Sequence, residues 1–277
     1  MINPAIAMAN AMAVFAPASF KRRAGAQFVT PRARKQTDRG REFLESLQII
    51  DIEAPKVVQR VYLSSRDGPL VFFQHGWEAD SADLSSHAKA LDAAGWRVAL
   101  IDGPAHGGSE GRRAVLPDFS AGLASVADQL GQPVAVVAHS MGLPATVVAM
   151  TEHGLTPRAV VGLGGPHSMR ANIEHQAPAM GLSARGTALL IEAVGERLGR
   201  SVDEFVIDER IAEAQAAALL IHGGRDEIVP PSGSQSIAQV WPGALCEIHD
   251  DLGHRGVLRD EAVIARVSEF LSAFLPA

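Results

Sequence analysis

Short apolar runs alternate with helical patterns along most of this chain, and this alternation limits the possible folds more than any other feature. The apolar runs begin at Val57 and read VVQRVYL, LVFFQHG, RVALIDG, VAVVAHS, AVVGLGG, ALLIHGG and ALCEIHD. Helical patterns separate most of them and lie at 83–94, 118–130, 143–153, 232–240 and 260–274. Such alternation predicts an α/β fold, with a mainly parallel central sheet covered by helices on both faces.

One interval, residues 166–215, interrupts the alternation because it has helical patterns but no clear strand. One helical pattern covers residues 187–198, and Ser201 with Glu204 forms a capping box before an amphipathic run that reaches Ile211. An insertion of about 50 residues after a strand is longer than an ordinary connection and predicts a small helical cap. We therefore expect an N-terminal helical arm and basic linker over 1–56, and an α/β domain over 57–277 with a cap at about 166–215.

The composition supports a folded protein and argues against several classes of partner. Hydrophobic residues make up 47% of the chain and charged residues 20%, which is typical of a globular protein with a large core. A net charge of −6 and an aromatic content of 5% argue against nucleic-acid binding. The single cysteine, Cys246, allows no internal disulfide and fits a reducing, cytoplasmic compartment.

The first 20 residues, MINPAIAMANAMAVFAPASF, are apolar and are followed by the basic cluster Lys21–Arg23. A helix packed on the body or on a second subunit would explain this pattern, and so would a helix on a membrane surface with a basic flank. We favour packing and a possible homodimer, because alanine makes the segment weakly hydrophobic and no basic residue precedes it. Packing predicts contacts for Ile2, Ile6, Val14, Phe15 and Phe20. The membrane alternative predicts an exposed apolar stripe beside Lys21–Arg23.

Ser140 stands at the junction between a buried strand pattern and a helical pattern. The segment AHSMG fits A-x-S-x-G, close to the G-x-S-x-G turn that exposes a nucleophilic serine between a strand and a helix. Small residues are needed two positions before and after the serine, because the strand and helix backbones crowd each other there. Ala138 is the one departure from this pattern. Ser140 is therefore the candidate nucleophile.

A serine hydroxyl needs a base, and the base needs an acid that orients it. In this type of fold the expected chain order is serine, then acid, then histidine. Asp226 follows the strand pattern LLIHGG and is the candidate acid, with its neighbour Glu227 as a weaker one. His249 and His254 are the candidate bases. We favour His254, because it lies in the loop before the last helix, where it can reach over the sheet.

An oxyanion hole would require two backbone N–H donors near Ser140. We expect these from Met141 and from Trp77, with Gly76 as the alternative to Trp77. Trp77, His139 and Met169 are the candidate substrate contacts. Other histidines also follow strand patterns, but none shows paired metal-ligand spacing. We therefore expect no cofactor and no catalytic metal, and a small molecule as the substrate.

These motifs give the chain a resemblance to the α/β-hydrolase superfamily from about Val57 to Phe274. HGW, DGPAHGGSEG, AHSMG, GGRDEIVP and LGHRG occur in the order of that family. DGPAHGGSEG resembles the family's D-x-P-G-H-G-x-S loop, with Ala105 in place of the first glycine. The segment FVTPRARKQTDRGREFLESL, together with HGWEAD, is similar to a group of uncharacterised bacterial hydrolases.

The resemblance implies an α/β-hydrolase fold and a Ser–His–Asp hydrolase that cleaves a small ester or amide through an acyl-enzyme. The superfamily also contains lyases, cofactor-free haloperoxidases and non-catalytic binding proteins, and these are the alternative functions. A lyase would use the same three residues. A binding protein would be expected to lack one of them. Dehalogenases are disfavoured, because they use an aspartate at the position of Ser140.

Overall fold

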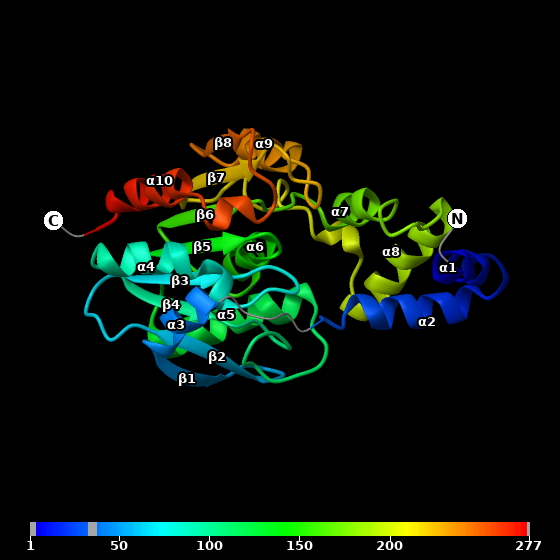
Figure 1. The fold of residues 1–277 in the computed structure, drawn as a ribbon, viewed down its shortest axis with the longest axis horizontal. Coiled ribbons are helices and arrows are strands. Elements are labelled where there is room, and N and C mark those ends of the chain that lie inside the picture. Colours follow the sequence, from blue (N-terminus) through cyan, green and yellow to red (C-terminus); the bar gives the residue numbers. More distant parts are fainter. Residues whose placement is uncertain (1–3, 33–37, 276–277) are drawn as a thin grey trace.

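The computed structural model describes residues 4–32 and 38–275, and its centre is an 8-stranded sheet. The strand order is β1-β2-β4-β3-β5-β6-β7-β8 (Figure 1). β1 and β2 pair antiparallel with each other, and β2 is antiparallel to β4, while all other pairs are parallel. The strands are β1 (Gln48–Glu53), β2 (Val58–Leu63), β3 (Leu70–Gln74), β4 (Arg97–Ile101), β5 (Ala135–His139), β6 (Ala159–Leu163), β7 (Ala217–Gly223) and β8 (Leu245–His249).

Helices cover both faces of the sheet, as the sequence predicts. On one face, α5 (Leu116–Leu130), α6 (Gly142–Glu152) and α9 (Ser232–Val240) pack on side chains such as Val136. On the other, α3 (Asp38–Glu45), α4 (Ser85–Ala93) and α10 (Glu261–Ser272) pack on side chains such as Val137. Val136 and Val137 are neighbours on β5 and face opposite sides because side chains alternate along a strand. The central strands are therefore buried on both faces, and the expected α/β architecture is confirmed.

The sheet begins before residue 57, where the sequence analysis places the start of the domain. β1 lies in the expected linker and forms a hairpin with β2, in which Ala54 N–H donates to the Val57 carbonyl at 3.0 Å. β1 is an edge strand, and Ile52 is its only fully buried residue. One buried side chain in six residues gives almost no hydrophobic period, so the sequence pattern does not reveal this strand.

Two helices lie between β6 and β7, over the carboxyl ends of the strands: α7 (Met169–Gln176) and α8 (Ala184–Leu198). The Ser183 hydroxyl accepts from Gly186 N–H at the start of α8, and Gly199 ends it in a left-handed conformation. The capping box at Ser201 is present, but it begins only the short 3₁₀ helix Val202–Glu204. The longer helical run does not form, because Phe205 turns inward to pack with Leu116.

An N-terminal arm, formed by α1 (Pro4–Phe15) and α2 (Pro17–Phe28), packs on α8 (Figure 1). Phe20 is buried, and Ile6 packs against Gly181, so the contacts expected for these two residues are confirmed. Val14 and Phe15 do not pack on the body, since these side chains are 50% and 86% exposed, and their alternative contact with a second subunit stays a prediction. The helix is apolar all round, and only one of its faces can lie against the cap. Ile2 lies outside the described residues.

No helix in the described ranges combines the length and the apolar character that a membrane crossing requires.

Candidate active site

Ser140 occupies a strained turn between β5 and α6. Its φ is 51°, a left-handed backbone that fits the strained nucleophile turn and costs about 1–3 kcal/mol for a non-glycine residue. The turn is crowded from two sides. A Cβ atom on Gly142 would lie 2.3 Å from the carbonyl oxygen of Gln74, and one on Gly76 would lie 2.7 Å from Cβ of Ser140. Both positions therefore require glycine, because the backbones around the serine turn approach each other so closely.

Asp226 and His254, which the sequence analysis pairs, are in contact. His254 Nδ1 lies 2.6 Å from Asp226 Oδ2, while Asp226 Oδ1 accepts from the N–H groups of Ile228 at 2.9 Å and Val229 at 2.8 Å. Burial alone would raise the pKa of Asp226. Hydrogen bonds from His222 and His254 outweigh that effect and hold the pKa well below its usual range. The acid is therefore ionised and fixed in orientation by four donors.

His222 is a member of this network that the sequence analysis does not single out. Its Nε2 lies 3.1 Å from Asp226 Oδ2 and 3.0 Å from the Val229 carbonyl, and its Nδ1 lies 2.7 Å from Ser234 Oγ. Both neighbours of Nε2 are acceptors, so Nε2 carries the proton and Nδ1 accepts from the serine hydroxyl. The spacing of four residues to Asp226 is the only sequence signal for this contact.

His139 precedes the nucleophile and touches the candidate base. Its Nε2 lies 3.1 Å from the carbonyl oxygen of His254, so the ring donates to the backbone of that residue. Burial lowers the pKa of His139 to about 3 and keeps its imidazole neutral. His139 lines the cavity described below, but its Nε2–H is already used by the protein.

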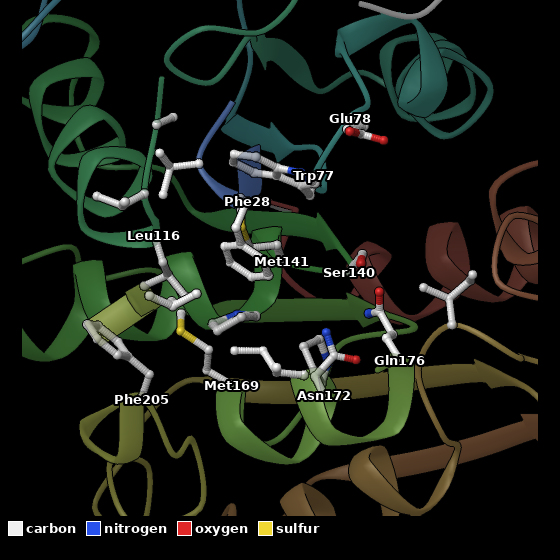
Figure 2. Close-up of a pocket in the computed structure, with 18 of the residues that line it drawn as sticks. Phe28, Trp77, Glu78, Leu116, Ser140, Met141, Met169, Asn172, Gln176 and Phe205 are labelled. Atoms are coloured by element: carbon white, nitrogen blue, oxygen red, sulfur yellow. The ribbon is translucent and has the colours of Figure 1, made fainter. Parts of the chain in front are cut away.

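A cavity of about 700 Å³ opens in front of Ser140 (Figure 2). The sheet side contributes Ser140, His254 and the expected wall residue Trp77, and Met169 lines the cavity from the cap as expected. Leu182 and Ile191 do not line the cavity and belong to the apolar cluster that joins α7 to α8. The remaining lining is mostly apolar and includes Phe28, Val29, Leu116, Met141, Ile173, Met180, Leu190, Val194, Leu198 and Phe205.

Two polar side chains of the cap also face the cavity. Asn172 and Gln176 point from α7 into it, on the side where Ser140 lies (Figure 2). The Asn172 Oδ1 atom is buried and has no hydrogen-bond partner among the described residues. Sequence reasoning missed both residues, because a polar residue in a helical pattern is usually exposed to solvent. It also missed the contribution of Phe28 and Val29, since nothing in the sequence places the arm at the cavity.

The loop after β3 carries one of the expected oxyanion donors. Within residues 4–32 and 38–275, the backbone N–H groups of Trp77 and Met141 donate to no other group, and both residues line the cavity. The next residue, Glu78, has a φ of 52°, and its N–H donates to His106 Nε2 at 3.1 Å. Its carboxylate pairs with Arg32 at 2.9 Å, which ties the arm to this loop.

The segment DGPAHGGSEG forms hydrogen bonds with the loop after β3 and holds it in place. Asp102 is buried and accepts from the N–H groups of Ser81 at 2.8 Å and Gly108 at 2.7 Å. Ala105 adopts a φ of 64°, the left-handed backbone that explains why the family pattern has glycine there. His75 Nε2 accepts from Gly103 N–H at 2.8 Å, and burial lowers the pKa of His75 to about 4. His75 is thus a neutral structural residue that joins two loops.

Comparisons with known proteins agree with the overall fold. Residues 67–194 match the family model described as serine aminopeptidase, S33. No curated protein matches the chain in sequence. An esterase from Pyrococcus furiosus is similar in structure, with a TM-score of 0.69 at 16% identity over 90% of this chain and 98% of that one.

Two further solved structures are similar to this chain. The esterase RhEst1 from a Rhodococcus species has a TM-score of 0.62 at 17% identity over 83% of this chain and 99% of its own. The ferulic acid complex of Est1E from Butyrivibrio proteoclasticus has a TM-score of 0.66 at 17% identity over 81% and 98%. Together with the strand order, these matches show that the chain has the α/β-hydrolase fold.

Proposed function

We propose that the protein is a serine hydrolase that cleaves carboxylic esters with an apolar acyl group. Ser140 is the nucleophile, His254 the general base and Asp226 the acid that orients the base. The observation that carries this proposal is the strained turn at Ser140, which opens into the same cavity that His254 lines while His254 is hydrogen-bonded to Asp226. Each of the three residue types occurs in the chain order expected for this fold.

The roles follow from the hydrogen bonds of each group. Asp226 Oδ2 accepts from Nδ1–H of His254, which leaves Nε2 of that ring free to take the proton of Ser140. The serine oxygen then attacks the ester carbonyl carbon, and the carbonyl oxygen becomes an oxyanion. His254 returns the proton to the alcohol as the bond to it breaks. A water molecule repeats these steps on the acyl-enzyme and releases the acid.

The N–H groups of Met141 and Trp77 would stabilise the oxyanion. They line the cavity next to Ser140 and have no other acceptor among the described residues. The helix α6 starts directly behind Met141, so the positive end of its dipole also faces this point. Removal of one such donor typically costs about 10²–10³ in rate.

The cavity lining supports an apolar acyl group. Leu190, Val194 and Leu198 come from one face of α8, and Leu198 packs in one cluster with Phe205. Figure 2 shows Phe205 at the end of the cavity away from Glu78. Such a lining stabilises hydrocarbon, because burial of each CH₂ group contributes about 0.8 kcal/mol. Asn172 and Gln176 offer the polar groups that would orient the ester itself.

Initial rates with p-nitrophenyl esters of increasing acyl length test the proposal. We expect the kcat/KM of the wild type to rise with chain length until the cavity is filled. Val194→Trp fills part of the cavity and should move the preferred length to shorter chains. Val240→Trp, on an exposed position of α9, is the matched control and should leave the length profile unchanged. An equal response of both variants would show that the acyl group does not bind beneath α8.

Peptide hydrolysis is the second activity to test, because the matching family model is named for an aminopeptidase. An aminopeptidase must bind a positively charged N-terminus. Among the described residues that line the cavity, Glu78 is the only acidic one, and Arg32 already pairs with its carboxylate. We therefore expect aminoacyl p-nitroanilides to be cleaved far more slowly than p-nitrophenyl esters. Comparable rates for the two substrate types would favour the peptidase.

A further inference from the structure

Large apolar side chains that stay exposed gather at the end of the molecule where the arm lies. α1 exposes Met8 and Phe15 at 62% and 86%, and Val14 beside them. Met180 is 51% exposed at the rim of the cavity, where Phe28 and Ile228 are also exposed. Ile6 packs on Gly181, so α1 lies directly beside Met180. We call this group of exposed apolar side chains the arm face; it consists of Met8, Val14, Phe15, Phe28 and Met180.

The outer side of α1 has no polar residue to explain its exposure. The helix reads PAIAMANAMAVF and contains no charged residue. Its one amide, Asn10, faces inward, where it donates to the Gly181 carbonyl at 2.9 Å and accepts from Ser183 N–H at 2.8 Å. The polar part of the helix is therefore used in contact with the cap, and the side turned to solvent is apolar. This is the reverse of an ordinary surface helix.

Three arginines lie on α2 and α8, the two helices that pack against α1. Arg185 Nε donates to the Ala13 carbonyl at 2.8 Å, which places a guanidinium in the last turn of α1. Arg22 and Arg23 follow in α2 and are exposed. Among the described residues, no carboxylate pairs with any of these three arginines, whereas Lys21 pairs with Glu192 and Glu196.

The sequence shows the same separation of charge. The first 37 residues contain six lysines and arginines and no aspartate or glutamate, although the whole chain has a net charge of −6. A basic and apolar segment on an otherwise acidic protein is attracted to an anionic surface, with the rest of the protein turned away from it.

We propose that the arm face docks on an anionic phospholipid surface. Phe15, Val14 and Met8 enter the boundary between headgroups and acyl chains, and Arg22, Arg23 and Arg185 contact the lipid phosphates. The exposed apolar stripe beside Lys21–Arg23 is what a membrane-surface helix requires. It matches the alternative that the sequence analysis set aside in favour of packing. The structure accommodates both, since one side of α1 packs on the cap and the other side is exposed.

A second copy of the chain fits this surface less well. A two-fold dimer places the same patch of each subunit against the other, so the arginines of both copies would gather at one interface. Like charges at an interface are unfavourable. A lipid surface instead supplies the opposite charge.

The inference goes beyond the proposed hydrolase activity, because docking needs no catalytic residue. It does have a consequence for access to the cavity. Met180 and Phe28 belong to the arm face and also line the cavity. A docked molecule therefore holds the cavity rim next to the lipid.

Sedimentation with large vesicles tests the proposal on the full chain. The two probes are vesicles of phosphatidylcholine alone and vesicles with 30% phosphatidylglycerol, a composition chosen to give a clearly negative surface at about 0.1 M salt. The wild type should bind the anionic vesicles at least tenfold more strongly than the neutral ones. Met8→Ser with Phe15→Ser should lower this binding at least tenfold, and so should Arg22→Glu with Arg23→Glu. The control Ile49→Ser, at an exposed apolar position on β1, should change nothing.

Three results would overturn the proposal. They are equal binding of the wild type to both kinds of vesicle, absence of binding, or binding that Met8→Ser with Phe15→Ser leaves intact. Sedimentation velocity identifies the competing occupant. A wild-type dimer that Phe15→Ser converts to a monomer would mean that the arm face is a subunit interface. Hydrolysis of a soluble p-nitrophenyl ester should be the same in wild type and Phe15→Ser, so a failure of docking is distinguishable from a failure of the enzyme.

Discussion

Replacement of Asp226 by asparagine should change the tautomer of His254, because the hydrogen bonds around residue 226 determine how the amide is oriented. Oδ1 of the carboxylate accepts from the N–H groups of Ile228 and Val229, at 2.9 and 2.8 Å. An amide at this position must therefore place its carbonyl oxygen there, and its NH₂ group takes the place of Oδ2. That NH₂ group then faces His254 Nδ1. A donor facing Nδ1 forces the ring to accept at Nδ1 and to carry its proton on Nε2, so the ring can no longer take the proton of Ser140.

The size of the effect follows from this change of tautomer. The same substitution in a serine protease lowers kcat by roughly 10⁴, which corresponds to about 5.4 kcal/mol at 1.36 kcal/mol for each factor of ten. Asp226→Asn also weakens a buried network, since the NH₂ group faces the Nε2–H of His222 as well. The loss of one charged hydrogen bond costs about 1.5–3 kcal/mol of the free energy of unfolding.

Steady-state kinetics with a p-nitrophenyl ester and thermal unfolding measure these two effects separately. We expect kcat to fall by about 10⁴, with little change in KM and a melting temperature lowered by several degrees. Asp250→Asn removes the same charge from an exposed residue near His254 and should leave both quantities unchanged. A variant Asp226→Asn that keeps more than a tenth of the wild-type kcat would refute the assignment of Asp226 as the acid.

Three further predictions concern activity and stability. Ser140→Ala should abolish ester hydrolysis, and an active Ser140→Ala would remove this residue from the mechanism. Ser140→Gly should also abolish hydrolysis. In addition it should raise the free energy of unfolding by up to about 1 kcal/mol, because glycine adopts a φ of 51° without strain. Burial lowers the pKa of His75 and of His87 to about 4, below about 6.5 in the unfolded chain. As the pH is lowered, the unfolded state therefore binds protons before the folded state does, and the free energy of unfolding measured in urea should fall between pH 6.5 and 4. His87→Gln should make this dependence on pH shallower. An unchanged dependence would contradict the reasoning. Deletion of residues 1–20 should lower the melting temperature, because it removes the buried Phe20 and the contact of Ile6 with Gly181; an unchanged value would mean that the arm adds no stability.

The parts of the fold that the sequence predicts are those in which many residues repeat one signal. β3 to β7 are buried on both faces, so each appears in the sequence as an uninterrupted apolar run. The contact between Asp226 and His254 is also predictable, because each residue follows a recognisable strand and the order of the strands brings their ends together. β1 is missed because only one of its side chains is fully buried.

The parts that the sequence does not predict depend on contacts between distant segments. His222 gains its place only through Ser234 and Asp226, and a histidine within a strand pattern gives no sign of either contact. The arm at the cavity rests on Gly25 approaching Ala193, where a Cβ on the glycine would lie 3.1 Å from Cβ of the alanine. No local pattern encodes a pairing over such a separation. Such pairings arise from complementary shape, which a single sequence does not display.

The arm and α8 pack on each other beside the cavity but come from the first and the middle parts of the chain. This has a consequence for biosynthesis. The hydrogen bond from Asn10 to the Gly181 carbonyl joins residues that are 171 positions apart. A ribosome that adds about 5–20 residues per second would finish the arm roughly 10–30 s before its partner helix emerges. During that interval α1, an apolar helix without a charged residue, has nothing to pack against. The nascent arm is thus a natural substrate for a chaperone, and it docks late although it is made first.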